Sequence, residues 1–253
     1  MVSPIEKLKG IVKRLRAPDG CPWDIEQTPK TITPHIIEEA YELVEAIESD
    51  NNDSIIDELS DQLLHVVMIS EMINESGGFS FDDVAKHCSD KMIRRHPHVF
   101  GEDSIKTTGE VNKKWEEIKS KEKPNESIVD GIPKHLPALL HAHKIQRKVA
   151  QVGFDWPDLN GPIEKLVEEC QELVEAISND HMDEEIGDIL FTIVNICRKC
   201  NKNAEELLQQ ANQKFKDRFK VCETIAKTHK TPMKDLNIKE LEMLWDQAKK
   251  LQK

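Results

Sequence analysis

Apolar residues recur three and four positions apart along most of this chain, which is the spacing of an amphipathic α-helix. The segment from Ile5 to Arg16 shows the pattern first, and a loop with Pro and Gly follows it. The spacing resumes at about Thr33, where we expect Thr33 to be the N-cap and Pro34 to stand in the first turn of the helix. This pattern predicts a helix-rich protein with ample apolar material for a core.

Acidic residues are interleaved with the apolar positions of the next two expected helices. The first contains E-E-A-Y-E-L-V-E-A-I, and the second begins at about Ser54 and continues into L-L-H-V-V-M-I. A further helix is expected from about Ser80 to Arg95, and a short one contains Trp115 and Lys119. A helix that is apolar on most sides, as the second of these is, needs packing partners on most sides.

Residues 121–137 form the best candidate for a linker, because this stretch is polar and contains three prolines. After it the helical pattern begins again, with an expected helix from Leu139 to Val149. We therefore predict an N-terminal helical domain over residues 1–120 and a C-terminal one over residues 138–253.

The polar pattern of the first half occurs again in the second half at a nearly constant offset. The offset is 130 residues from Glu39 to Glu169, 127 from Glu58/Asp61 to Glu185/Asp188, 123 from Lys91/Arg95 to Lys214/Arg218, and 130 from Trp115/Lys119 to Trp245/Lys249. Core packing alone would repeat apolar positions but not these polar pairs. The chain is therefore an internal duplication of a functional unit.

Two acidic pairs of the second half are expected to meet. Glu169 and Glu172 are three residues apart, as are Glu185 and Asp188, so each pair shares a helix face. The short S-N-D-H segment between the two helices predicts an antiparallel hairpin that brings the four carboxylates together. Acidic solvated helix faces are the alternative, but the interleaved apolar residues and the duplication favour a site for a hard divalent cation.

Each half adds a Lys/Arg pair and a Trp/Lys pair to its carboxylates. Lysine and arginine complement phosphate oxygens, and a tryptophan ring can stack on a base. Together with a bound cation these residues describe a site for a nucleoside polyphosphate. The sequence contains no G-x-x-x-x-G-K-[ST] loop and no evident Ser/His/Asp or Cys/His nucleophile, so hydrolysis would use a metal-activated water.

The net charge of −12 argues against a nucleic-acid polymer as partner. No apolar run approaches a membrane span of ~20 residues, and the N-terminus lacks the apolar stretch of a signal peptide. We therefore expect a cytoplasmic protein that does not bind membranes. The six cysteines are scattered, and without a second CxxC motif we interpret them as structural or incidental thiols.

Several stretches of the chain resemble one family of enzymes. The E-E-x-x-E helix followed by E-x-x-D is similar to that of the all-α nucleoside triphosphate pyrophosphohydrolases, and in particular to the MazG family. G-C-P-W-D-I-E-Q-T, R-R-H-P-H-V-F, I-V-D-G-I-P-K-H-L-P-A-L, G-F-D-W and K-F-x-x-R-F also resemble that family. The resemblance covers nearly the whole chain, and the combination of motifs is specific, whereas E-E-x-x-E alone is not.

The resemblance implies an all-α fold of two tandem MazG-like helical domains, with a four-helix-bundle-type packing that is completed in a homodimer. It implies hydrolysis of NTPs and dNTPs to the monophosphate and pyrophosphate with Mg²⁺, or alternatively Mn²⁺. The acids that match metal-binding positions are Glu169, Glu172, Glu185 and Asp188, with Glu168 beside them as a further catalytic residue, and Glu39, Glu42, Glu58 and Asp61 in the first repeat. The positions that match substrate contacts are Lys165, Lys214, Arg218, Trp245 and Lys249, and Lys91, Arg95, Trp115 and Lys119.

The two repeats are not equivalent, because Lys165 has no lysine counterpart. At the shift of 130 residues it falls on His35, and the resemblance also implies that the C-terminal domain is the more active one. Two other functions remain open at this point. One is a narrower pyrophosphatase acting on dUTP or phosphoribosyl-ATP, and the other is a helical nucleotide-binding regulator without turnover.

Overall fold

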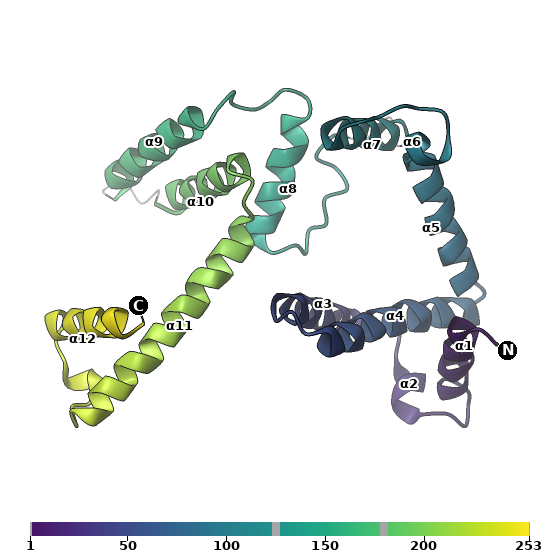
Figure 1. The fold of residues 1–253 in the computed structure, drawn as a ribbon, viewed down its shortest axis with the longest axis horizontal. Helices are drawn as coiled ribbons and strands as arrows, with labels where there is room; N and C mark the ends of the chain where they lie inside the picture. The colour runs from purple at the N-terminus through teal and green to yellow at the C-terminus, as the bar shows by residue number, and fades with distance from the viewer. Residues whose placement is uncertain (1, 123–126, 178–181, 253) are drawn as a thin grey trace. The chain divides into compact units, whose positions relative to one another are not determined.

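The computed structural model describes residues 2–122, 127–177 and 182–252. That part of the chain consists of helices joined by loops and turns and contains no β-strand (Figure 1), so the all-α prediction is confirmed. The chain divides into two compact units, Met1–Pro124 and Asn125–Lys253. Among the described residues, no helix is both long and apolar enough to cross a bilayer.

The first unit is built on a pair of helices, α3 and α4, that pack along each other (Figure 1). A short connection joins them, and α1 packs against α4. The elements of this unit are α1 (Pro4–Leu15), α2 (Pro22–Glu26), α3 (Thr33–Glu48), α4 (Asn52–Glu75), α5 (Phe81–Arg95), α6 (Pro97–Phe100) and α7 (Thr108–Glu122). Its core consists of Val12, Ile32, Val67, Met68 and Met72.

The entry into α3 differs from the prediction that Thr33 is the N-cap. The capping position is Ile32, which has a helical conformation, makes no side-chain cap and is only 1% exposed. Its amide already donates to the Thr28 carbonyl at 3.2 Å, and the Thr33 hydroxyl donates to the Pro29 carbonyl. Burial of Ile32 in the core therefore decides where the helix begins, and the hydrogen bonds to the Thr28 and Pro29 carbonyls tie the start of the helix to the preceding turn.

Helix α5 begins with the capping arrangement that its sequence encodes. The Ser80 hydroxyl accepts from the Asp83 amide, and the Asp83 carboxylate accepts from the Ser80 amide. This capping box satisfies two amides that would otherwise have no partner at the start of the helix. It fixes the beginning of the helix that carries Lys91 and Arg95.

The second unit is organised around helices α9 and α10, which also pack along each other (Figure 1). Helix α8 packs on α10, and α11 packs on α12. The elements are α8 (Ala138–Ala150), α9 (Asn160–Ala176), α10 (Met182–Lys199), α11 (Ala204–Thr228), the 3₁₀ turn η1 (Met233–Asp235) and α12 (Ile238–Leu251). The S-N-D-H turn that we expected between α9 and α10, residues 178–181, lies outside the described residues, as do residues 123–126 of the expected linker.

Candidate functional site

Three carboxylates of the second unit meet between α9 and α10. Glu169 and Glu172 on α9 and Glu185 on α10 each offer an oxygen, and these oxygens lie within 4.8 Å of one another. Glu169 is 3% exposed, and its Oε2 atom is buried without a hydrogen-bond partner among the described residues. A buried, unpartnered carboxylate oxygen is costly, and a bound cation would supply the missing partner.

The acids of this cluster also affect one another electrostatically. Desolvation raises the pKa of Glu172, and the charge of Glu169 raises it further. The pKa of Glu185 is raised by desolvation and by the charges of Glu172 and Glu169. Desolvation, together with the crowding of like charges, therefore disfavours full ionisation of the cluster unless a cation is present. Asp188 is exposed on α10 and lies outside the group of three.

Lys165 is placed at the edge of the same cluster, on α9. Its Nζ atom lies 2.7 Å from Glu169 Oε1 and 2.8 Å from Glu168 Oε1. Hydrogen bonds to Glu168 and to Glu169 raise the pKa of Lys165, so this side chain is cationic at any working pH. The second unit thus has one fixed positive charge against its most buried acid.

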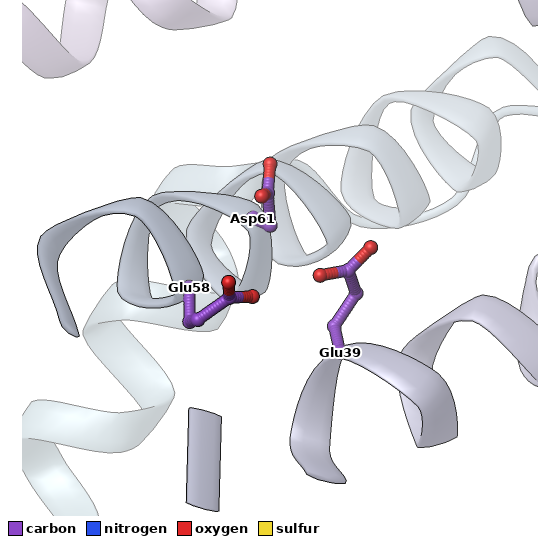
Figure 2. A group of neighbouring side chains, drawn as sticks. All are labelled: Glu39, Glu58 and Asp61. Carbon is purple, nitrogen blue, oxygen red and sulfur yellow. The ribbon is translucent and has the colours of Figure 1, made fainter. Parts of the chain in front are cut away.

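The first unit has a corresponding cluster between α3 and α4. Figure 2 shows Glu39 on α3 facing Glu58 and Asp61 on α4, and their ligand atoms lie within 4.8 Å of one another. Desolvation raises the pKa of both Glu39 and Glu58. The negative charge of Asp61 raises the pKa of Glu39 further, and the negative charge of Glu42 raises that of Glu58. Glu58 Oε2 is buried without a hydrogen-bond partner among the described residues.

Both clusters fit a hard divalent cation on the evidence of their donors. Each offers three carboxylate oxygens from two helices and contains a buried oxygen that has no partner in the described part of the chain. Mg²⁺ and Mn²⁺ prefer oxygen ligands. The structure brings together three of the four acids expected in each repeat. The fourth differs: it is Glu42 in the first repeat and Asp188 in the second, and their ligand role stays a prediction.

His35 occupies the place of Lys165 in the first unit. Its Nδ1 atom lies 3.6 Å from Glu38 Oε2, and its ring makes an edge contact with Trp23 at a centroid distance of 6.0 Å. The contact parallels the pairing of Lys165 with Glu168, but an imidazole does not carry the permanent positive charge of a lysine ammonium group. The first cluster therefore lacks the fixed charge of the second.

The arginine and tryptophan of each repeat come together on a neighbouring pair of helices. Arg95 on α5 places its Cζ atom 5.2 Å from the ring centre of Trp115 on α7, and Arg218 on α11 does the same at 5.0 Å from Trp245 on α12. This is the geometry of a cation–π contact. Lys91 and Lys214 stand one turn before these arginines, and Lys119 and Lys249 one turn after the tryptophans.

Within the described residues, these cationic pairs form no hydrogen bond or ion pair with the acidic clusters. Lys249 pairs with Asp246 at 3.1 Å, and Lys119 lies 3.8 Å from Glu116. Within each helix pair the structure thus brings the arginine against the tryptophan. Joint action of the acidic and cationic groups on one ligand stays a prediction.

A polar anchor that the sequence analysis did not identify holds the loop before α9. Asp155 lies 2.5 Å from Arg198 Nη2 and 2.9 Å from Lys199 Nζ, at the C-terminal end of α10. In the next turn of chain, the Trp156 ring covers Gly161, where an added Cβ would lie 2.0 Å from a ring atom. The sequence shows the G-F-D-W motif that contains Asp155, but Arg198 is 43 residues away from it. No local sequence pattern therefore identifies the partners of Asp155.

Comparisons with known proteins agree with these observations. A family model described as the MazG nucleotide pyrophosphohydrolase domain matches residues 27–100 and 161–223, which contain both acidic clusters. The chain is 41% identical over 258 residues to the nucleoside triphosphate pyrophosphohydrolase of Escherichia coli (strain K12), covering 98% of each chain. It is 42% identical over 246 residues to the nucleoside triphosphate pyrophosphohydrolase/pyrophosphatase MazG of Thermotoga maritima, covering 96% of this chain and 95% of that protein.

Proposed function

Because this chain belongs to the family of MazG nucleotide pyrophosphohydrolases, we propose that it hydrolyses nucleoside triphosphates, ribo and deoxy, to the monophosphate and pyrophosphate with Mg²⁺. The observation that carries the proposal is the buried carboxylate of Glu169, with an unpartnered oxygen and two acidic neighbours. One oxygen of this carboxylate is paired with Lys165, whereas the other is buried with no partner among the described residues. The second oxygen is therefore placed to bind a cation that accompanies a polyphosphate.

The reaction is a displacement at the α-phosphorus. A water oxygen bonds to phosphorus, the bond to the oxygen that bridges the α- and β-phosphates breaks, and pyrophosphate leaves with the electron pair. The proton of the water passes to a carboxylate or to solvent. When Mg²⁺ is bound, it activates the water and offsets charge on the phosphates. Glu169, Glu172 and Glu185, with Asp188, would hold it.

The remaining residues of the second repeat bind and orient the substrate. Glu168 stands beside the metal ligands with its carboxylate bonded to Lys165, so we assign it to the attacking water or to substrate. Lys165, Lys214, Arg218 and Lys249 supply positive charge for the phosphate oxygens. The Trp245 ring, which lies against Arg218, offers a flat apolar face to the nucleoside.

We propose that each repeat binds its own metal ion but that the second repeat carries most of the turnover. The first cluster has its own convergent acids and its own unpartnered oxygen on Glu58, so it should bind Mg²⁺. It has His35 in place of Lys165, and one fewer fixed charge leaves more of the transition-state charge unbalanced. We therefore assign most of the activity to the second repeat.

The apolar surface of each helical pair supports assembly into a homodimer. Side chains left outside the core on α3 and α4 include Tyr41, Val44, Leu59 and Leu63, and those on α9 and α10 include Val174, Ile186 and Leu190. Each of these is more than 40% exposed. Two helical pairs can cover such faces by joining into a four-helix bundle, and a second copy of the chain supplies the matching pair.

Product analysis tests the proposed activity directly. The purified protein is incubated with Mg²⁺ and a panel of ribo- and deoxynucleoside triphosphates, and the products are separated by ion-exchange chromatography. The expected result is monophosphate plus pyrophosphate from many of them. Cleavage of dUTP alone would favour the narrower pyrophosphatase, and binding without cleavage would favour a nucleotide-binding regulator. Release of inorganic phosphate and a diphosphate would contradict attack at the α-phosphorus.

A further inference from the structure

The arginine of the first repeat is already occupied by a carboxylate of the same chain. Glu122, at the end of α7, accepts from Arg95 Nη2 at 2.5 Å and from Arg94 Nε at 2.8 Å. Hydrogen bonds from Arg95 and then Arg94 lower the pKa of Glu122 to about 2, so the carboxylate is ionised at any working pH. The Arg95 side chain is 15% exposed, so the donors that face Glu122 are not also spread into solvent.

The second repeat has an amide at the corresponding place. Glu122 follows Lys119 by three residues, and Gln252 follows Lys249 by three residues. Arg218 Nε donates to Gln252 Oε1 at 3.2 Å. The two arginines lie at similar distances from their tryptophans, and they differ in the charge of the side chain that accepts from them.

The net charge around the two arginines would not by itself make the first repeat the weaker phosphate site. Arg94 adds a cation to the first repeat, and its counterpart at the offset of 123 is Asp217. Asp217 accepts from Gln213 at 2.9 Å and lies 3.7 Å from Lys220, so it interacts along the neighbouring face of α11 rather than with Arg218. Counted over these helix pairs alone, without Lys165 and His35, the charges would let the first repeat attract an anion at least as well as the second. The arrangement of the donors favours the second repeat instead, because Arg95 is already paired with a carboxylate.

We propose that Glu122 and Gln252 are specificity-determining residues that set the affinity of the two repeats for a polyphosphate. Glu122 takes the guanidinium donors that a phosphate would use and repels the phosphate, so the first repeat is held in a self-paired, weakly binding state. Gln252 positions Arg218 without cancelling its charge. The inference rests on the proposed function, because it takes both arginines as phosphate contacts.

The test is a reciprocal exchange in the full-length protein, Glu122→Gln and Gln252→Glu. Binding of α,β-methylene-ATP, a triphosphate that cannot be cleaved at the scissile bridge, is measured by titration calorimetry with Mg²⁺. Glu122→Gln should tighten the weaker site by about tenfold, and Gln252→Glu should weaken the tighter site by about as much. In steady-state assays Gln252→Glu should raise KM more than it lowers kcat, because it alters ground-state phosphate binding.

Glu110→Gln is the matched control, since it removes one negative charge from the same helix but pairs with the amides of Lys106 and Thr107 rather than with an arginine. If it tightens binding as much as Glu122→Gln, the effect is one of net charge and the inference is overturned. An unchanged weak site in a folded Glu122→Gln protein, with helix content verified by circular dichroism, overturns it too. Arg218→Gln distinguishes a failure of this inference from a failure of the proposed function. If this variant binds the analogue normally, the proposed contact between Arg218 and the phosphates is wrong.

Discussion

The Lys165 Nζ atom lies 2.7 Å from Glu169 Oε1, so the most buried acid of the second cluster is paired with a cation of its own helix. The first cluster has His35 at this position, 3.6 Å from Glu38. Lys165 thus lowers the repulsion among the acids and adds charge where a triphosphate would approach. The ammonium group of Lys165 competes with a metal ion for Glu169, but it would favour catalysis by offsetting the charge of the phosphates. Loss of Lys165 should therefore change metal affinity and catalysis in opposite directions.

Replacing Lys165 with Met should weaken catalysis while strengthening metal binding. We expect kcat/KM to fall by about 10- to 100-fold, since one charge-assisted contact to the phosphates is lost. Mn²⁺ affinity, measured by titration in the absence of nucleotide, should rise because no ammonium group competes for Glu169. His35→Met is the control and should change neither quantity by much. A fall in both activity and Mn²⁺ affinity would show that Lys165 supports the metal site structurally.

Glu172→Gln and Glu42→Gln, assayed on the same triphosphate, compare the two repeats. Glu172 belongs to the group of three convergent acids in the second repeat, and its loss should lower turnover on the order of several hundred-fold at saturating Mg²⁺. Glu42→Gln should retain most of the activity, because we assign turnover mainly to the second repeat. The opposite ranking would move the activity to the first repeat, and equal halves would mean two independent working sites.

Asp155→Asn should destabilise the second unit by about 2 kcal/mol, because it leaves Arg198 and Lys199 without their anion. Burial raises the pKa of Asp155, but hydrogen bonds from Arg198 and Lys199 outweigh it, and the pKa lies below the ordinary value of 3.8. The stability from this pair is therefore present above about pH 3.8 and is lost as the pH falls through the lowered value.

Urea denaturation at a series of pH values, followed by circular dichroism, measures this effect. The difference in the free energy of unfolding between the original protein and Asp155→Asn should shrink as the pH falls below 3.8. Asp235→Asn removes an exposed carboxylate from η1 and serves as the control, for which we expect no comparable loss. A constant difference at every pH would mean that packing, rather than charge, accounts for the role of Asp155.

The protein should be a homodimer at micromolar concentration, as measured by light scattering. Val174→Lys places a charge on an apolar side chain that is 68% exposed on α9, so it should leave the unit folded but shift the mass towards the monomer. Ile238→Lys makes the same change at a residue that is 70% exposed at the start of α12, and it should leave the mass unchanged. A monomer mass for the unaltered protein would refute the assembly.

The sequence by itself determined the helical class and the repetition of the polar pattern in the two halves of the chain. These properties are local, because a spacing of three or four residues fixes which side chains share a helix face. Glu169 and Glu172 could therefore be placed together without a structure. The prediction failed at Thr33, where a local capping preference gave way to the burial of Ile32 in the core.

Only the tertiary structure decided which groups meet across helices. The rotation of α9 against α10 and of α3 against α4 selects Glu185 in one cluster and both Glu58 and Asp61 in the other. The same holds for Glu122, which reaches Arg95 from 27 residues away. Such contacts depend on how two helices pack, and packing is set by apolar contacts along their whole length rather than by the polar residues that it brings together.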